Sequence, residues 1–313
     1  MKTSQPILRS CLVALFVLGG FFLSPAYGQN QHVPSPRQDF PAGPLPNALA
    51  FDGSNIWVTN QNAATVTKLR ASDGVILGTF PVGDTPLDIV FDGTNIWVSN
   101  FYGGTVTELR SSDGAVLGTF ATGNNPAGLA FDGTNILVAN YSDFTITKLR
   151  ASDGANQGSF SVGFFPLFLV VAGENLWLTN YQTNTVQEAR LSDGVVLGTF
   201  PVGSSPQGIA FDGKKIWVAN IGESNITVLS ARDGSLIETI PTIGYPYRLV
   251  QLGTGMWATI YNINKVTRFD TRLKGPDRTT RVGNSPVGIT TDGSSIWVAN
   301  SGDGTVSKLS FGP

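Results

Sequence analysis

The sequence repeats a unit of 40 residues seven times without insertion or deletion, and this repeat limits the possible folds more than any other feature. When the chain is divided at residues 41, 81, 121, 161, 201, 241 and 281, the sixth position of every unit is Pro. The seventeenth position is Trp in six units and Leu137 in the third, and these six are all the Trp residues of the chain. A repeat of about 20–50 residues indicates a propeller, a solenoid or a similar array.

Each unit is expected to form four short antiparallel strands, here called a to d. In the second unit, segments rich in Val, Ile, Thr, Trp and Phe place them at 87–91, 95–99, 105–109 and 116–120. Asp-Gly pairs separate a from b and c from d, and Gly at such positions accepts the positive φ of a tight hairpin. The 37 Gly residues and the low charged fraction of 13% suit a fold with many tight turns.

Strand a is apolar on both faces, as Leu49, Ala50 and Phe51 illustrate, so each sheet must pack between two others. Seven four-stranded sheets that pack radially satisfy this requirement. The sequence therefore predicts an all-β fold, a seven-bladed β-propeller that spans residues 36–313. The last unit stops before its strand d, and segment 36–40 resembles the missing piece. We expect this N-terminal strand to pair with strand c at 305–309, complete the last blade and close the ring.

The first 28 residues have the pattern of a secretory signal peptide. Lys2 and Arg9 precede an apolar run at 12–23, and the small residues Ala26 and Gly28 end the segment. The run is shorter than the roughly 20 residues of a membrane span, so we expect cleavage after about Gly28 rather than a membrane anchor. Residues 29–35 then form a short lead-in, and the mature chain is expected in the periplasm or outside the cell.

Cleavage leaves a mature chain with few of the usual catalytic groups. It removes Cys11, the only Cys, and leaves His32, in the lead-in, as the only His. Loss of Lys2 and Arg9 from the 20 basic residues leaves 18 against 22 acidic residues, a net charge of −4. A His base, a Cys nucleophile and a His/Cys metal site are therefore excluded from the ring. Basic residues of strand c alternate with acids instead of forming a stripe, so general nucleic-acid binding is not expected.

Strand b carries a family resemblance. Three of its copies read Trp57-Val58-Thr59-Asn60, Trp97-Val98-Ser99-Asn100 and Trp217-Val218-Ala219-Asn220. They resemble the Tyr-Val-Thr-Asn core of YVTN-repeat propellers, with Trp in place of the signature Tyr, and the resemblance covers residues 36–313. The sixth unit departs further, with Trp257-Ala258-Thr259-Ile260 and no Asn. The resemblance implies a propeller fold and export but no particular activity.

The architecture is also distantly similar to the exported, seven-bladed streptogramin-lyase propellers. The chemistry of that family relies on a catalytic His. The ring here contains no His that can take over this role.

Most repeated residues are interpreted as architecture. One Trp per blade at a fixed place favours packing between blades over a ligand cage. The Asn that ends strand b is expected to satisfy backbone groups where the chain turns, rather than to form a ring of ligands. The repeated Asp residues are expected in hairpin turns.

Function is expected where the units differ, on the face that carries the d–a and b–c connections. This face is rich in aromatic residues, which bind sugars, peptides or flat organic molecules by stacking. The alternative is that several of them only cover the core. The aromatic candidates in these connections are Phe101, Tyr102, Tyr141, Phe164, Phe165, Tyr181, Tyr245, Tyr247 and Tyr261.

The eighth position of the unit, at the start of strand a, adds three candidates. It is Gly or Ala in four units but Asp88, Phe168 and Arg248 in units two, four and six. Units two and six lie far apart around a ring, so we expect Asp88 and Arg248 to face each other across the channel mouth. A charged pair beside an aromatic wall is a candidate small-ligand site, and a solvated pair without a ligand is the alternative.

These observations favour an exported, non-catalytic, monomeric propeller that binds a small molecule, a glycan or a protein through the variable face. The alternative is an exported hydrolase or lyase that uses Tyr or carboxylates, such as Asp84 with Asp88, at the channel mouth. No cofactor is predicted. An oxygen-only Ca²⁺ site would belong to the enzyme alternative, but the Asp residues suit turns better than a shared cage.

Overall fold

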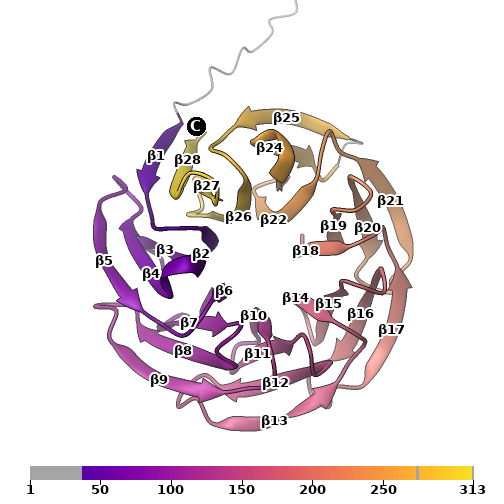
Figure 1. The fold of residues 1–313 in the computed structure, drawn as a ribbon. Coiled ribbons are helices and arrows are strands. Elements are labelled where there is room, and N and C mark those ends of the chain that lie inside the picture. Colours follow the sequence, from indigo (N-terminus) through magenta and orange to yellow (C-terminus); the bar gives the residue numbers. More distant parts are fainter. Residues whose placement is uncertain (1–36, 273–274, 312–313) are drawn as a thin grey trace, which may run out of the picture. The chain divides into compact units, whose positions relative to one another are not determined.

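The computed structural model describes residues 37–272 and 275–311, which fold into seven four-stranded antiparallel sheets around a common axis (Figure 1). Each sheet is one blade, and its strands follow the order a, b, c, d outward from the axis. The prediction of a seven-bladed propeller is confirmed. The expected signal peptide at 1–28 and lead-in at 29–35 lie outside the described residues.

The strands of the seven blades have similar lengths and follow one another in sequence. Blade one contains β2 (Pro46–Phe51), β3 (Asn55–Asn60), β4 (Thr65–Arg70) and β5 (Ile76–Pro81), and blade two contains β6 (Pro86–Phe91), β7 (Asn95–Asn100), β8 (Thr105–Arg110) and β9 (Val116–Ala121). Blade three contains β10 (Pro126–Phe131), β11 (Asn135–Asn140), β12 (Thr145–Arg150) and β13 (Asn156–Ser161), and blade four contains β14 (Pro166–Ala172), β15 (Asn175–Asn180), β16 (Thr185–Arg190) and β17 (Val196–Pro201). Blade five contains β18 (Pro206–Phe211), β19 (Lys215–Asn220), β20 (Asn225–Ser230) and β21 (Leu236–Pro241), and blade six contains β22 (Pro246–Leu252), β23 (Gly255–Ile260), β24 (Lys265–Asp270) and β25 (Pro276–Arg281). Blade seven contains β26 (Pro286–Thr291), β27 (Ser295–Asn300), β28 (Thr305–Ser310) and β1 (Gln38–Pro41).

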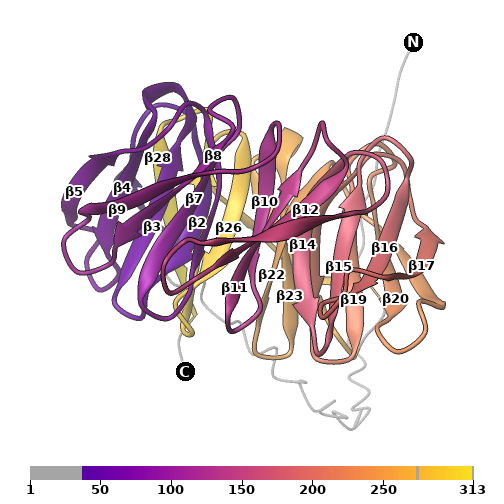
Figure 2. The same ribbon diagram turned by 90° about the horizontal axis from the view of Figure 1, so that it is seen from below.

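Two single-turn 3₁₀ helices, η1 (Gln61–Ala63) and η2 (Tyr261–Ile263), connect strands b and c in blades one and six. No helix within the described ranges is long and apolar enough to cross a membrane. The inner strands of the blades run from one face of the ring to the other, and the outermost strands lie along the rim (Figures 1 and 2). Because neighbouring strands alternate in direction, the d–a and b–c connections share one face, and the a–b and c–d hairpins share the opposite face.

Each strand of blade two extends one residue beyond its predicted range. The reason is backbone pairing at the strand ends. Asn100 pairs with Pro86 of strand a and with Thr105 of strand c, and Arg110 pairs with Asn95. The side-chain pattern placed these end residues in turns, but their backbone groups still belong to the ladder.

The ring closes as predicted, because β1 pairs antiparallel with β28 and takes the place of strand d in blade seven. In this register Asp39 lies opposite Ser307 and Phe40 opposite Val306. The Phe40 ring stacks on Trp297 with 5.8 Å between centroids, as Phe120 does on Trp97 in blade two. The closing strand therefore supplies both backbone pairing and core packing.

The Trp column packs between blades, as predicted. Trp57 of blade one is fully buried and belongs to a cluster with Ile89, Ile96 and Val98 of blade two. The other Trp residues occupy the same place between later blades, and Leu137 fills it between blades three and four.

The Asp of the a–b hairpin, present in five of the seven units, has a role that its turn position did not reveal. The Oδ1 atom of Asp92 accepts backbone N–H groups within the hairpin, and its Oδ2 atom accepts the indole N–H of Trp97 at 2.7 Å. The same Asp-to-Trp bond occurs in blades one, five and seven. One side chain thus fixes both the turn and the ring that packs between blades.

The expectation for the Asn column is wrong in most blades. The amide of Asn100 donates to the hydroxyl groups of Thr105 and Thr107 at 3.0 and 2.9 Å, rather than to the backbone of its own turn. The side chain points sideways across the sheet toward strand c, where these hydroxyls lie. Of the six Asn residues that end strand b, all of them described, only Asn140 accepts a backbone N–H with its side chain, from Gly123 at 3.1 Å.

Candidate binding site at the channel mouth

A pocket of about 460 Å³ lies over the axis on the face with the d–a and b–c connections. Six of the seven blades contribute to it, so it sits at the mouth of the central channel and not between two neighbouring blades. It is lined by Gln61, Thr85, Leu87, Phe101, Tyr102, Tyr141, Leu167, Phe168, Tyr181, Gln207 and Tyr247.

A continuous row of aromatic rings forms one wall of this pocket, above blades two to four. The centroid of Phe101 lies 5.1 Å from that of Tyr102 and 6.2 Å from that of Tyr141. Tyr141 in turn lies 5.2 Å from Phe165, which packs against Phe144. Phe101 and Tyr141 both follow the Asn that ends strand b and begin the b–c turns of neighbouring blades, so they occupy equivalent places in the wall.

Six of the predicted candidates line the pocket, namely Phe101, Tyr102, Tyr141, Phe168, Tyr181 and Tyr247. Phe165 supports Tyr141, and Tyr261 lies beside Tyr247 with 5.9 Å between ring centroids. Phe164 and Tyr245 are exposed and are not part of the lining. The aromatic candidates therefore divide into a pocket group, a supporting group and two outlying residues.

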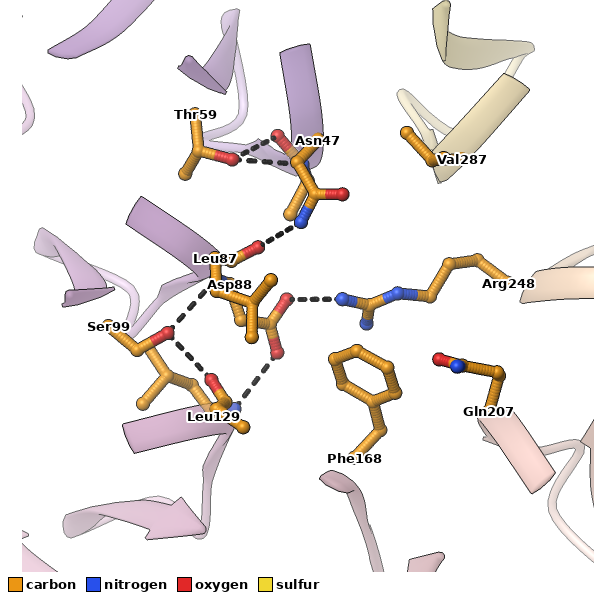
Figure 3. A network of polar contacts seen from close by, with 12 residues as sticks. Asn47, Thr59, Leu87, Asp88, Ser99, Leu129, Phe168, Gln207, Arg248 and Val287 are labelled. Carbon is orange, nitrogen blue, oxygen red and sulfur yellow. Dashed lines mark hydrogen bonds and ion pairs between the residues drawn. The ribbon is translucent and has the colours of Figure 1, made fainter. Parts of the chain in front are cut away.

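Asp88 and Arg248 meet across the channel, although 160 residues separate them in sequence (Figure 3). The Nη2 atom of Arg248 lies 3.3 Å from Oδ1 of Asp88, and the two side chains are only 16% and 12% exposed. The other Asp88 oxygen accepts the backbone N–H of Leu129 at 2.9 Å, and the Asp88 N–H donates to Ser99 Oγ. Asp88 is thus fixed by two blades, and Arg248 reaches it from the opposite side of the ring.

The third large residue at this position joins the ion pair to the pocket. The Arg248 guanidinium carbon lies 3.4 Å from the ring centroid of Phe168, which gives a close cation–π contact (Figure 3). Phe168 also lines the pocket, whereas Asp88 and Arg248 lie one position further along strand a than the lining residues Leu87 and Tyr247. The pair therefore lies just beyond the lining, next to a ring that the two share.

Small and large residues alternate at this position around the ring. A Cβ on Gly208 would lie 2.6 Å from the Tyr247 carbonyl oxygen and 2.8 Å from Arg248 Cα. Gly128 has the same close contact with the backbone of Phe168. Gly thus allows neighbouring strands a to converge, and the large side chains of alternate blades fill the axis. The sequence showed three exceptions to a Gly/Ala column, but not this reason for their spacing.

Sequence reasoning missed the non-aromatic lining residues, in particular Leu87, Leu167 and Gln207. All three occupy the seventh position of the unit. A usable signal was present there, because this position carries six different residue types in seven units, and only Leu occurs twice. The missed residues Gln61 and Thr85 come from connections that carry no aromatic ring at those positions.

The pocket is lined by neutral side chains, since none of its eleven described lining residues carries a charge at neutral pH. Burial raises the pKa of Tyr247, so its phenol stays protonated and can donate a hydrogen bond. Within the described residues, no group of three or more His, Cys, Asp or Glu side chains is placed to hold a metal ion. Asp84 is exposed and bonds to Thr85, and no contact joins it to Asp88 among these residues.

Comparisons with known proteins were made for both sequence and fold. No family model matches the sequence. No curated protein matches it either.

Solved structures do resemble the fold. A streptogramin B lyase structure superposes with a TM-score of 0.77 at 19% identity, covering 88% of this chain and 98% of the lyase. The hydrazine synthase of Kuenenia stuttgartiensis also gives a TM-score of 0.77, at 18% identity, covering 91% of this chain and 99% of that one. These likenesses establish the fold. At such identities they carry no activity over to this chain.

Proposed function

We propose that this protein is an exported, non-catalytic binding protein that holds a small molecule with a flat, largely apolar body at the channel mouth. The observation that carries the proposal is the aromatic pocket of about 460 Å³, which falls in the usual size range of small-molecule sites. Export is inferred from the signal-like first 28 residues.

The lining supports stacking with a few directional polar contacts. Phe101, Tyr141 and Tyr181 are half-buried, so each keeps part of its ring available at the channel mouth. Gln207 and the neutral phenol of Tyr247 can orient a bound molecule through hydrogen bonds. This combination suits a compact planar ligand better than a long glycan or a protein surface, which were the broader expectations.

The alternative, an exported hydrolase or lyase, finds less support at this site. Asp88 already uses one oxygen for Arg248 and the other for the Leu129 N–H. A general base needs a carboxylate oxygen within reach of the proton it removes. The pocket lining offers no carboxylate for this purpose.

The proposal is tested by a thermal-shift screen of the mature protein against planar aromatic compounds, followed by calorimetric titration of the hits. A compound that binds only the folded state raises the melting temperature in proportion to ln(1 + [L]/Kd). Tyr141→Ala should weaken binding of a hit by about tenfold or more, since it removes a stacking ring from the pocket wall. Tyr245→Ala is the matched control, because Tyr245 is an exposed aromatic of the same face outside the lining.

If Tyr245→Ala weakens binding as much as Tyr141→Ala does, the ligand does not occupy this pocket and the proposal fails. The screen should also be run with and without Ca²⁺. A large Ca²⁺-dependent shift together with turnover of a bound compound would favour the hydrolase instead.

A further inference from the structure

The Arg248 guanidinium is held in place but uses little of its hydrogen-bonding capacity. An Arg side chain has five N–H donors arranged as a planar fork. Within residues 37–272 and 275–311, the Arg248 side chain makes one hydrogen bond, a single contact of 3.3 Å to Asp88. A carboxylate that pairs with both arms of the fork makes two bonds, each of about 2.7–2.9 Å. The geometry leaves room for a better partner.

Asp88 does not depend on Arg248 for its position. Its second oxygen accepts the Leu129 N–H at 2.9 Å, and its own N–H is bonded to Ser99. Figure 3 shows Asp88 attached to the strands beside it, while Arg248 extends into the channel from the far side. The Arg248 side chain is therefore the more movable partner, with its flat face resting on Phe168.

We propose that Arg248 recognises an anionic group of the ligand, and that a ligand carboxylate replaces Asp88 as the partner of the guanidinium. This inference rests on the proposed function, since the rest of the ligand lies among the aromatic rings. Phe168 connects the two parts, because its ring lines the pocket and also supports the guanidinium. The ligand class is a planar aromatic carboxylate, with its acid group directed down the channel.

The Asp88–Arg248 pair also has a purely structural explanation, as a brace between blades two and six. The two explanations differ in the sign of one effect. If Asp88 competes with the ligand for Arg248, its neutralisation strengthens binding of an acid. If the pair is only a brace, loss of either charge loosens the channel mouth and weakens binding of acidic and neutral compounds alike.

The test uses two probes of the same shape, naphthalene-2-carboxylate and its neutral amide, titrated by calorimetry into the mature protein and three variants. The wild type should bind the acid more tightly than the amide. Arg248→Gln should weaken acid binding about 10- to 100-fold and leave amide binding unchanged, as expected for loss of a hydrogen-bonded charge. Asp88→Asn should strengthen acid binding about fivefold, because the competing charge is gone while the side-chain oxygen can still accept the Leu129 N–H. Arg248→Lys should bind the acid with intermediate affinity, since it keeps the charge without the fork.

Equal affinity of the wild type for acid and amide overturns the inference about charge but leaves the pocket proposal intact. Weaker acid binding by Asp88→Asn identifies the pair as a brace and also overturns it. If neither probe binds the wild type, the pocket does not accept planar aromatic bodies, and both proposals fall. Melting curves of each variant establish folding, and Asp88→Asn tests the inference even if Arg248→Gln does not fold.

Discussion

At the scale of single residues, four of the six Trp residues combine packing between blades with a hydrogen bond from the indole N–H to an Asp of the a–b hairpin. Trp97 of blade two packs against blade three, stacks on Phe120 with 5.5 Å between ring centroids and donates its indole N–H to Asp92. Trp177 lacks the last of these contacts. Its buried indole nitrogen has no partner among the described residues, because Ala172 stands where blade two has Asp92. An unpaired buried donor is destabilising, so blade four carries a local defect.

Ala172→Asp should repair this defect. The new carboxylate would stand at the sequence position from which Asp92 accepts the Trp97 N–H, and a Gly follows it as in blade two. The hairpin of blade four differs in its backbone, since Ala172 still pairs with Asn175. We expect the free energy of unfolding to rise by about 1 kcal/mol, measured by urea denaturation. The reverse change in blade two, Asp92→Ala, should lower it by about 1–3 kcal/mol. An unchanged unfolding curve for Ala172→Asp would show that the indole N–H is satisfied in another way.

At the scale of the strand, strand c carries buried charges whose partners depend on their sign. Lys68 and Lys148 reach across to backbone carbonyls of the next blade, at Ser111 and Leu191. Glu108 instead accepts a bond from Asn95 of its own blade, and Glu188 does the same with Asn175. These two Lys residues of strand c thus link blades, whereas the two Glu residues bond within their own blade.

This difference predicts a pH effect. Burial raises the pKa of Glu108, and the nearby Asp92 carboxylate adds to the increase. The folded state then holds its proton at a pH where the unfolded chain has released it, so this residue favours folding at low pH and disfavours it as the pH rises through the raised pKa. Glu108→Gln should therefore melt at a higher temperature than the wild type at pH 7. The difference should shrink as the pH falls below the ordinary pKa of Glu.

The melting series needs a control for removal of a negative charge as such. Glu174→Gln serves this purpose, because Glu174 is an exposed residue of a hairpin turn. If both variants gain equally at pH 7, the effect comes from net charge and not from burial of Glu108.

At the scale of the whole molecule, the fold could be predicted almost completely because the 40-residue repeat fixes strand number and order. The candidate site could be predicted only in part. Comparison of the seven units, with the shared positions set aside, found the aromatic wall and placed Asp88 opposite Arg248. It did not find Leu87 or Gln207, whose roles depend on how strands a converge, and it gave no sign of the stacking of Arg248 on Phe168. Such contacts depend on side-chain conformations at the axis, which a column of residue types does not contain.

Ring closure gives the prediction at this scale. A chain that starts at residue 44 lacks β1 and with it the ladder to β28, the Phe40–Trp297 stack and the bond from Ser307 to Asp39. We expect it to lose about 3 kcal/mol or more in free energy of unfolding, as for deletion of a large core ring. A chain that starts at residue 37 keeps β1 and is the control. Equal melting temperatures for the two chains would mean that β1 contributes nothing to closure.

The origin of blade seven also sets an order of events during synthesis. Blades one to six each come from one continuous stretch of chain, so none of them needs a strand from the other end of the chain. Strand β1 is made first, yet its partner β28 is made last. Phe40 can therefore pack on Trp297 only after nearly the whole ring has been synthesised. Asp88 and Arg248 belong to blades that the open chain does not hold opposite each other, so the site at the axis is expected to mature only after the last blade is assembled.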